Sequence, residues 1–307
     1  MLYKKLIFKK LIIGLLLIYP CFSSFAQDVL GRSEIAGLSN VITTAVPFLM
    51  IGPDSHTGGM GEVGVALPND LNAQHWNPAK YIFSPNKGGI SVSYSPWLSG
   101  LEINDIYIAY LSGYYKITNY DAISMSLRYF SMGEMELRDY DGNNPLGENV
   151  KVSPHEFAID AAYSRKFTKE LSMSVSGRFI YSNLTTEDPL GEGIKPGMTG
   201  AADICLFYQK KLHAERLYKS IIGFGVNISN IGGKISYSSS MERDFLPANF
   251  RIGTAYTMYV DKYNSLTFAL DFSKLLVPTN PLYYSDSVDK DGNKVIAAGK
   301  DPSNSSV

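Results

Sequence analysis

Residues 171–184 read LSMSVSGRFIYSNL, and alternate positions of an extended chain face opposite sides. One face carries the apolar and aromatic residues Met173, Val175, Phe179 and Tyr181, together with Gly177. The other face is mostly polar, with Ser172, Ser174, Ser176, Arg178 and Ser182. A period of two is typical of a β-strand that separates two different environments. The stretch therefore predicts a long, two-faced strand.

The same alternation returns in three other places, at residues 157–164, 222–229 and 266–272. Strands of soluble sandwich proteins average about 5–6 residues. A tilted strand that crosses a bilayer needs roughly 9–11 residues. The longest alternating stretches in this chain fit the second class. We therefore predict an all-β fold, a transmembrane antiparallel β-barrel.

The first 26 residues have the parts of an export signal. Four lysines precede an apolar run over residues 11–18, and Ser24-Phe25-Ala26 offers a small-x-small cleavage site. Pro20 directly before Cys21 is a poor fit to a lipobox, which disfavours a lipoprotein. We predict a cleaved signal peptide over residues 1–26. A signal peptide followed by a barrel predicts an integral protein of the Gram-negative outer membrane.

The composition excludes several classes of function. The 28 basic and 29 acidic residues leave the chain nearly neutral, which argues against a nucleic-acid partner. Only Cys205 remains after signal cleavage, so neither an internal disulfide nor a cysteine-based metal site is expected. The 21 tyrosines and 15 phenylalanines lie largely on the alternating stretches and predict aromatic girdles at both rims of the barrel.

Residues 27–87 do not alternate and are rich in Gly, Pro and Asn. Their apolar positions, among them Phe48 and Trp76, nevertheless require burial. Irregular segments of this length usually have a function. We predict that residues 27–87 form a plug, or hatch, inside the barrel.

Residues 88–274 are predicted to be the barrel wall. The connections alternate between short ones, such as 118–120 and 168–170, and long ones, such as 138–152 and 185–197. Outer-membrane barrels have short periplasmic turns and long external loops, so the first strand is expected to run outward. The expected strands are 88–95, 104–117, 121–137, 153–167, 171–184, 198–210, 220–230, 247–260 and 265–274.

This count of about nine strands is odd, whereas bacterial single-chain barrels have an even number. Residues 285–307 form a polar tail that contains no closing aromatic strand, and we expect residues 275–307 to lie in an external loop. An unclosed sheet would expose its edges to lipid. The sequence is therefore expected to be C-terminally truncated.

Three motifs suggest chemistry but lack the context for it. Residues 59–64 match the dinucleotide pattern G-x-G-x-x-G, yet no strand precedes them and Pro68 would end a following helix. The turn at 289–292 lacks two carboxylates of a calcium loop. His56 and His75 have neither metal-ligand spacing nor a nucleophile beside them.

The carboxylates of Asp160, Asp203 and Asp271 fall on inward positions of their strands, where a hydrated lumen would explain them. We expect no enzymatic activity, catalytic residue, metal or cofactor.

Two segments carry a resemblance to a known family. Residues 44–66 read TAVPFLMIGPDSHTGGMGEVGVA, and residues 74–80 read QHWNPAK. Together they resemble the N-terminal motif of the PorV family of outer-membrane shuttle proteins of the type IX secretion system. Asn77-Pro78-Ala79 is also similar to a motif of the wider FadL family. The plug residues that carry the resemblance are Pro53, Gly59, Met60, Gly61, His75, Trp76, Asn77 and Pro78.

The resemblance implies a FadL-like barrel of about fourteen strands when complete, with about nine here. It also implies partners: a SprA-like translocon channel, the C-terminal signal domains of secreted cargo, a PorU-like sortase complex, and outer-membrane lipid with lipopolysaccharide. The expected function is to bind cargo at the translocon and shuttle it to the cell-surface attachment complex. The alternative is a FadL-like transporter of fatty acids or other hydrophobic compounds. A barrel hydrolase is a third, weaker possibility.

Overall fold

The structure is a computed structural model, and the residues it describes all lie within Val41–Val307. The described residues are 43–97, 100, 103, 105–137, 150–184, 195–213, 219–237, 243–261, 263–278, 282–288 and 294–298. The expected signal peptide and residues 27–42 lie outside this part of the chain. Most of the two long connections expected at 138–152 and 185–197 also lies outside it.

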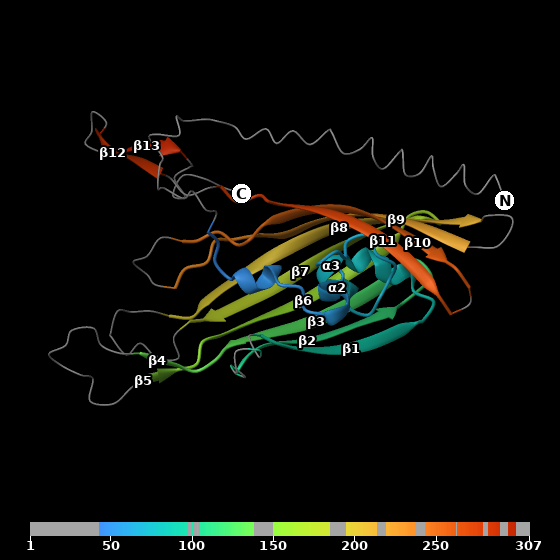
Figure 1. The fold of residues 1–307 in the computed structure, drawn as a ribbon, viewed down its shortest axis with the longest axis horizontal. Helices are drawn as coiled ribbons and strands as arrows, with labels where there is room; N and C mark the ends of the chain where they lie inside the picture. The colour runs from blue at the N-terminus through green and yellow to red at the C-terminus, as the bar shows by residue number, and fades with distance from the viewer. Residues whose placement is uncertain are drawn as a thin grey trace. The chain divides into compact units, whose positions relative to one another are not determined.

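Nine antiparallel strands form one sheet in the order β1-β2-β3-β6-β7-β8-β9-β10-β11 (Figure 1). Neighbours in the sheet therefore follow each other along the chain, apart from a small separate pair, β4 (Met135–Leu137) and β5 (Val150–Val152). The nine strands are β1 (Gly88–Pro96), β2 (Ile106–Lys116), β3 (Asp121–Met132), β6 (His155–Lys166), β7 (Leu171–Asn183), β8 (Gly197–His213), β9 (Lys219–Gly232), β10 (Asn249–Tyr259) and β11 (Ser265–Leu275).

The predicted all-β class is confirmed, and the antiparallel sheet is consistent with a β-barrel. Among the described strands the sheet is not closed, because β1 and β11 each pair on one edge only. The strand predicted over 121–137 is interrupted, since Gly133 has a φ of 81° and separates β3 from β4. Left-handed backbone of this kind cannot continue a regular strand.

The expected external loop over 275–307 contains two short strands that the sequence analysis did not predict. They are β12 (Leu282–Val288) and β13 (Lys294–Ala298), which pair with each other. No helix in the described ranges is both long and apolar enough to pass through a membrane.

The two faces of the sheet differ as the alternation predicts. On the convex face, apolar side chains such as Val92, Val175 and Phe268 are 57–77% exposed. This face also carries a row of ring contacts that crosses five strands, with centroid distances of 4.9–6.1 Å. The row, which we call the aromatic belt, consists of Tyr94, Tyr107, Tyr129, His155, Tyr181 and Phe157. It lies toward the end of the sheet where the long connections begin.

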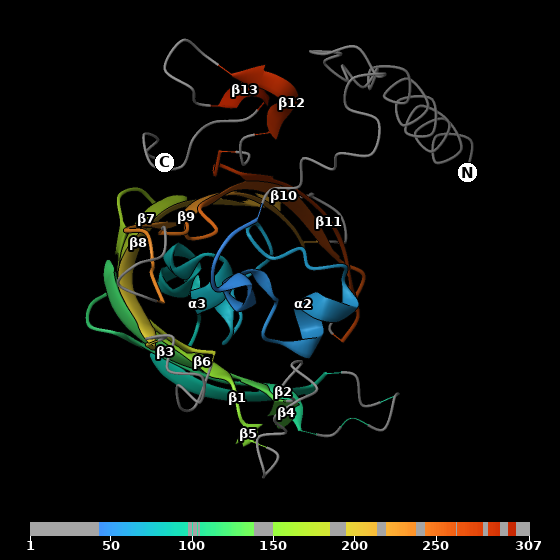
Figure 2. The ribbon, with the colours of Figure 1, turned by 90° about the vertical axis from the view of Figure 1, so that its left-hand side faces the viewer.

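The concave face surrounds residues 43–87, which we call the inner segment. Figure 2 shows its helices α2 (Ser55–Gly59) and α3 (Ala73–Trp76) inside the curve of the sheet. The inner segment also contains two 3₁₀ helices, η1 (Pro47–Met50) and η2 (Pro78–Phe83). Proline occupies the first turn of both, where its missing N–H leaves no helical hydrogen bond unmade.

A buried charge network joins five strands beneath the inner segment. The Arg178 guanidinium on β7 donates to Asp160 on β6 and, at 2.9 Å, to Asp203 on β8. It also donates to the side-chain oxygen of Asn230 on β9, while Ser126 on β3 donates to Asp160 at 2.9 Å. All five side chains are buried. The carboxylates of Asp160 and Asp203 are thus paired with Arg178. The sequence had suggested instead that water in a lumen would surround them.

Replacing Arg178 by alanine should destabilise the sheet strongly, because it leaves Asp160 and Asp203 buried and facing each other without a cation. Breaking a buried ion pair in this way costs about 3–5 kcal/mol. The free energy of unfolding in urea, measured on protein reconstituted in liposomes, tests this expectation.

Arg165→Ala is the matched control, because the Arg165 side chain is 58% exposed in its contact with Asp121. An exposed pair contributes less than about 1 kcal/mol. Equal losses in the two variants would show that the Arg178 network is not the structural element inferred here.

Candidate functional site

The inner segment packs against the sheet through four separate apolar clusters. Near its start, Val46, Phe48 and Leu49 pack with Ala158 and Ile180 of the wall. Further clusters join Tyr81 to Tyr114, Val65 to Ala255, and Ala79 to Phe207. Contacts to strands from β2 to β10 fix the segment along most of its length. The candidate site is this interface between the inner segment and the wall.

Trp76 is a large side chain of the inner segment that is almost completely buried, with 1% of its surface exposed. Its indole N–H donates to the Asp54 carboxylate at 3.1 Å, and the same carboxylate caps α2 by accepting from the Thr57 N–H at 2.9 Å. The Arg251 guanidinium of β10 lies 4.6 Å from the ring centroid, within cation–π range. Gly64 packs so closely on the ring that a Cβ there would overlap it. The indole therefore ties α2, the Gly64 loop and β10 together.

Asn77 and the two residues after it connect the inner segment to three strands. The Asn77 side-chain N–H₂ donates to the carbonyls of Val65 at 3.1 Å and Leu206 at 2.9 Å. Ser164 donates to the Pro78 carbonyl at 3.0 Å, and Ser172 donates to the Ala79 carbonyl at 2.7 Å. Buried carbonyls outside a sheet need such partners, since an unpaired one costs about 1–3 kcal/mol.

Two more side chains of the wall bind the backbone of the inner segment. Asp271 on β11 accepts from the N–H groups of Gly64 at 2.8 Å and Val65 at 3.0 Å. Asn227 on β9 donates to the Trp76 carbonyl at 2.8 Å. Asp271 therefore lies on the concave face, as its position in the alternation suggested, but it anchors the inner segment instead of lining a hydrated lumen.

Arg128 on β3 binds the inner segment at two points. Its buried guanidinium donates to the carbonyls of Phe48 at 3.2 Å and Leu49 at 3.0 Å, and it also contacts Nδ1 of His75. Because arginine has only donors, Nδ1 must accept, and the neutral His75 ring carries its proton on Nε2. Removal from water, and then the positive charge of Arg128, hold the pKa of His75 well below its usual range.

Lys80 in η2 is fully buried, and its ammonium donates to the Gly64 carbonyl at 2.8 Å. Burial lowers the pKa of this lysine, while the surrounding carboxylates of Asp70, Asp271 and Asp54 oppose that shift. The Gly64 loop is thus held from both sides, by Lys80 at its carbonyl and by Asp271 at its N–H.

The residues predicted from the motif fall into two groups. His75, Trp76, Asn77 and Pro78 contact the wall, and Pro53 precedes the Asp54 cap of α2; all of them except the partly buried His75 are buried. Gly59, Met60 and Gly61 lie at the end of α2, where both glycines are exposed and Met60 packs partly against the Val65 cluster. Gly61 has a φ of 79°, which explains a glycine at this turn without a nucleotide.

Sequence reasoning missed most of the wall side chains of this interface, namely Arg128, Asn227, Ser164, Ser172 and Arg251. The available signal was their alternation phase, which places polar residues on the face opposite the exposed apolar ones. That signal identifies an inward side chain but not its partner. Asp271 and Gly64 are 207 residues apart in the sequence.

Glycines of the wall let the inner segment approach the sheet at backbone distance. A Cβ at Gly225 on β9 would overlap the Val65 carbonyl oxygen, and one at Gly223 would overlap that of Ala66. Neither carbonyl belongs to a flexible side chain that could turn away. Glycine is required at both positions for this packing.

Gly225→Ala should therefore displace the Gly64 loop and expose the inner segment, including the buried Lys80. We expect trypsin to cleave after Lys80 in the folded variant at a rate at least tenfold above that of the unaltered protein. Gly177→Ala is the control, because nothing lies within 4 Å of a Cβ built there. Unchanged protection of Lys80 in Gly225→Ala would contradict the close packing described here.

Acidification should loosen the interface through His75. Its pKa is lower in the folded than in the unfolded state, so its contribution is complete above about pH 6.5 and is lost as the pH falls below that value. The loss approaches about 1.4 kcal/mol per pH unit until the folded-state pKa is reached. In a Trp97→Phe background, acrylamide quenching of Trp76 should increase between pH 7.5 and 5.5.

His75→Gln keeps a neutral acceptor for Arg128 and should abolish this pH dependence. His56→Gln should retain it, because His56 is exposed on α2. If the Trp97→Phe protein with His75 intact shows the same quenching of Trp76 at both pH values, His75 is excluded as the titrating group.

Comparison with known proteins agrees with this architecture. A family model described as type IX secretion system protein PorV matches residues 35–282. The matched range includes the whole inner segment and all nine strands of the sheet. No curated protein matches the chain.

Proposed function

The chain belongs to the PorV family, an outer-membrane component of the type IX secretion system, and we propose that it is a cargo shuttle of that system. In this role it binds the C-terminal signal domain of a secreted protein at the translocon and delivers it to the cell-surface attachment complex. The observation that carries the proposal is that the inner segment fills the concave side of the sheet (Figure 2). An inner segment anchored to wall strands from β2 to β11 favours a protein that handles cargo at its surface over an open conduit.

We propose that residues 27–87 act as a plug. The described part of this range is held by side chains of β3, β6, β7, β9 and β11. Its own Asn77 side chain donates to the Leu206 carbonyl of β8. Bonds to so many strands make a large movement of the segment costly, since each buried group that loses its partner costs about 1–3 kcal/mol. A fixed plug would keep the outer membrane sealed while cargo is exchanged outside it.

We propose that cargo binds at the end of the sheet where the long connections lie. The first of these, 138–152, continues from β4 and returns through β5, which pair with each other beyond β3 and β6. A strand pair that extends from the wall offers backbone groups to which a cargo strand could be added. The connection 185–197 begins at the neighbouring strand β7 and is the second proposed contact.

The proposed partners follow from this role. They are a SprA-like translocon channel, the C-terminal domains of secreted cargo, and a PorU-like sortase complex that attaches cargo to lipopolysaccharide. The chain itself is proposed to have no enzymatic role. Transport of fatty acids is the alternative, but the buried Arg128, Arg178, Asp160 and Asp203 make the concave face polar, which disfavours an apolar conduit.

Deletion of the gene should trap cargo in the periplasm, because no shuttle would collect it from the translocon. Immunoblots of periplasmic fractions should then show cargo precursors that retain their C-terminal domains, and the cell surface should lack the mature cargo. Complementation with the unaltered gene should restore both.

Normal secretion in the deletion strain would refute the proposal. Restoration of labelled fatty acid uptake, rather than of secretion, by the complementing gene would favour the alternative. The two readouts are independent, so a single pair of strains separates the two functions.

A further inference from the structure

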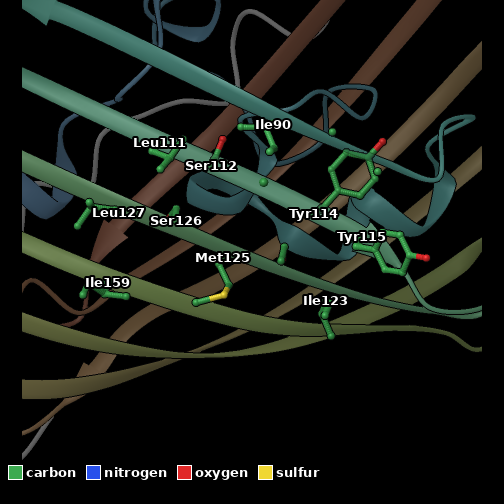
Figure 3. Close-up of a pocket in the computed structure, with 14 residues that line it drawn as sticks. Ile90, Leu111, Ser112, Tyr114, Tyr115, Ile123, Met125, Ser126, Leu127 and Ile159 are labelled. Atoms are coloured by element: carbon green, nitrogen blue, oxygen red, sulfur yellow. The ribbon is translucent and has the colours of Figure 1, made fainter.

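The convex face contains an apolar hollow of about 860 Å³ on β1, β2, β3 and β6. Gly113 on β2 leaves space at its centre, because it pairs in register with Ile90 on one side and Met125 on the other. Figure 3 shows the surrounding side chains, of which those on the convex face include Ile90, Leu111, Tyr115, Ile123, Met125 and Leu127. Hollows of about 300–1,000 Å³ are the size of ordinary ligand sites.

The lining is both apolar and exposed. Ile90 is 74% exposed, Met125 60% and Ile123 45%. On the concave side of the same strands, Ser112 and Tyr114 are buried against the inner segment. The hollow is therefore a feature of the outer surface alone, and its chemistry suits a hydrocarbon chain.

One end of the hollow carries a positive charge. The Lys87 ammonium lies 5.2 Å from the centroid of the Tyr115 ring, which itself lines the hollow. Lys87 is exposed, and its carbonyl accepts from the Lys116 N–H at 2.7 Å, which places it beside the short turn 117–120. Nearby on the same face, Asp121 accepts from Tyr163 and pairs with Arg165 at 3.5 Å. The carboxylate of Asp121 is thus engaged by Tyr163 and Arg165, whereas the Lys87 ammonium lies beside Tyr115 at the end of the hollow.

The hollow lies between two levels that suit the two edges of an apolar layer. Tyr107 of the aromatic belt and Tyr115 are eight residues apart on β2, which corresponds to about 27 Å of strand and, at the tilt of about 35–45° that barrel strands adopt, to about 19–22 Å of height. The apolar band of an outer-membrane barrel is about 25 Å tall, with aromatic girdles at both edges. Lys87 and Tyr115 mark the edge at the short turns, which face the periplasm in such barrels.

We propose that this hollow binds a glycerophospholipid of the periplasmic leaflet. Its acyl chain would occupy the space over Gly113, and its phosphate would pair with the Lys87 ammonium. Lipopolysaccharide does not satisfy this geometry, because the cation lies at the short-turn end and lipopolysaccharide belongs to the opposite leaflet. The proposal rests on the outer-membrane location of the family and is independent of cargo binding, so its failure would leave the shuttle function intact.

Native mass spectrometry of the full chain, released from detergent micelles with added phosphatidylglycerol, tests the proposal. Lys87→Gln should weaken lipid binding about five-fold, since one basic residue contributes about 1 kcal/mol near an anionic headgroup. Gly113→Leu fills the hollow and should weaken binding by at least about ten-fold. Met125→Trp fills it from β3, and provides a second test if Gly113→Leu does not fold.

Gly177→Leu and Lys169→Gln are the controls and should bind the lipid normally. Gly177 has open space around it on the same face, and Lys169 is exposed in another short turn. Equal lipid binding by all variants would overturn the proposal. A preference for lipid A over phosphatidylglycerol would also overturn it. The proposal would also be overturned if the Lys87, Gly113 or Met125 variants kept the lipid but no longer co-purified with the translocon. The hollow would then be a protein contact.

Discussion

The structure depends on one constraint: the inner segment lies inside the sheet without being a strand of it. Its backbone N–H and C=O groups therefore have no ladder to join, and buried groups of this kind need other partners. Side chains of the wall supply them, through Asp271, Arg128 and Asn227 and through two serines. Some of the polar side chains on the inward face of the strands serve this purpose, while Arg178, Asp160 and Asp203 mainly bind one another.

The same requirement explains why small residues occur where the segment approaches the wall. The carbonyls of Ala66 and Val65 lie so close to Gly223 and Gly225 that a residue with a Cβ would overlap them. Trp76 then fills the remaining space and joins α2 to β10. The polar contacts fix the backbone of the segment, and the apolar clusters around Phe48 and Tyr81 pack its side chains against the wall.

Much of the fold could be predicted from the sequence, because alternation is a local property of the strand itself. Nine strands were expected and nine form the sheet, and the bounds of β7 (Leu171–Asn183) differ from the prediction by one residue. The break at Gly133 could not be foreseen, since glycine is compatible with both extended and left-handed backbone. The partners of Asp160, Asp203 and Arg128 depend on which strands become neighbours, and no local pattern encodes that. Trp76, Asn77 and Pro78 were identified by resemblance, whereas their packing role emerged only from the structure.

An inner segment anchored at so many points is what the proposed role requires, namely exchange of cargo outside the membrane without a path opening through it. Hydrogen–deuterium exchange of the full chain in lipid nanodiscs tests this most directly. The account predicts that amides of residues 64–83 exchange as slowly as those of β6 and β7. Exchange of these amides within seconds, at the rate of an unstructured loop, would contradict it.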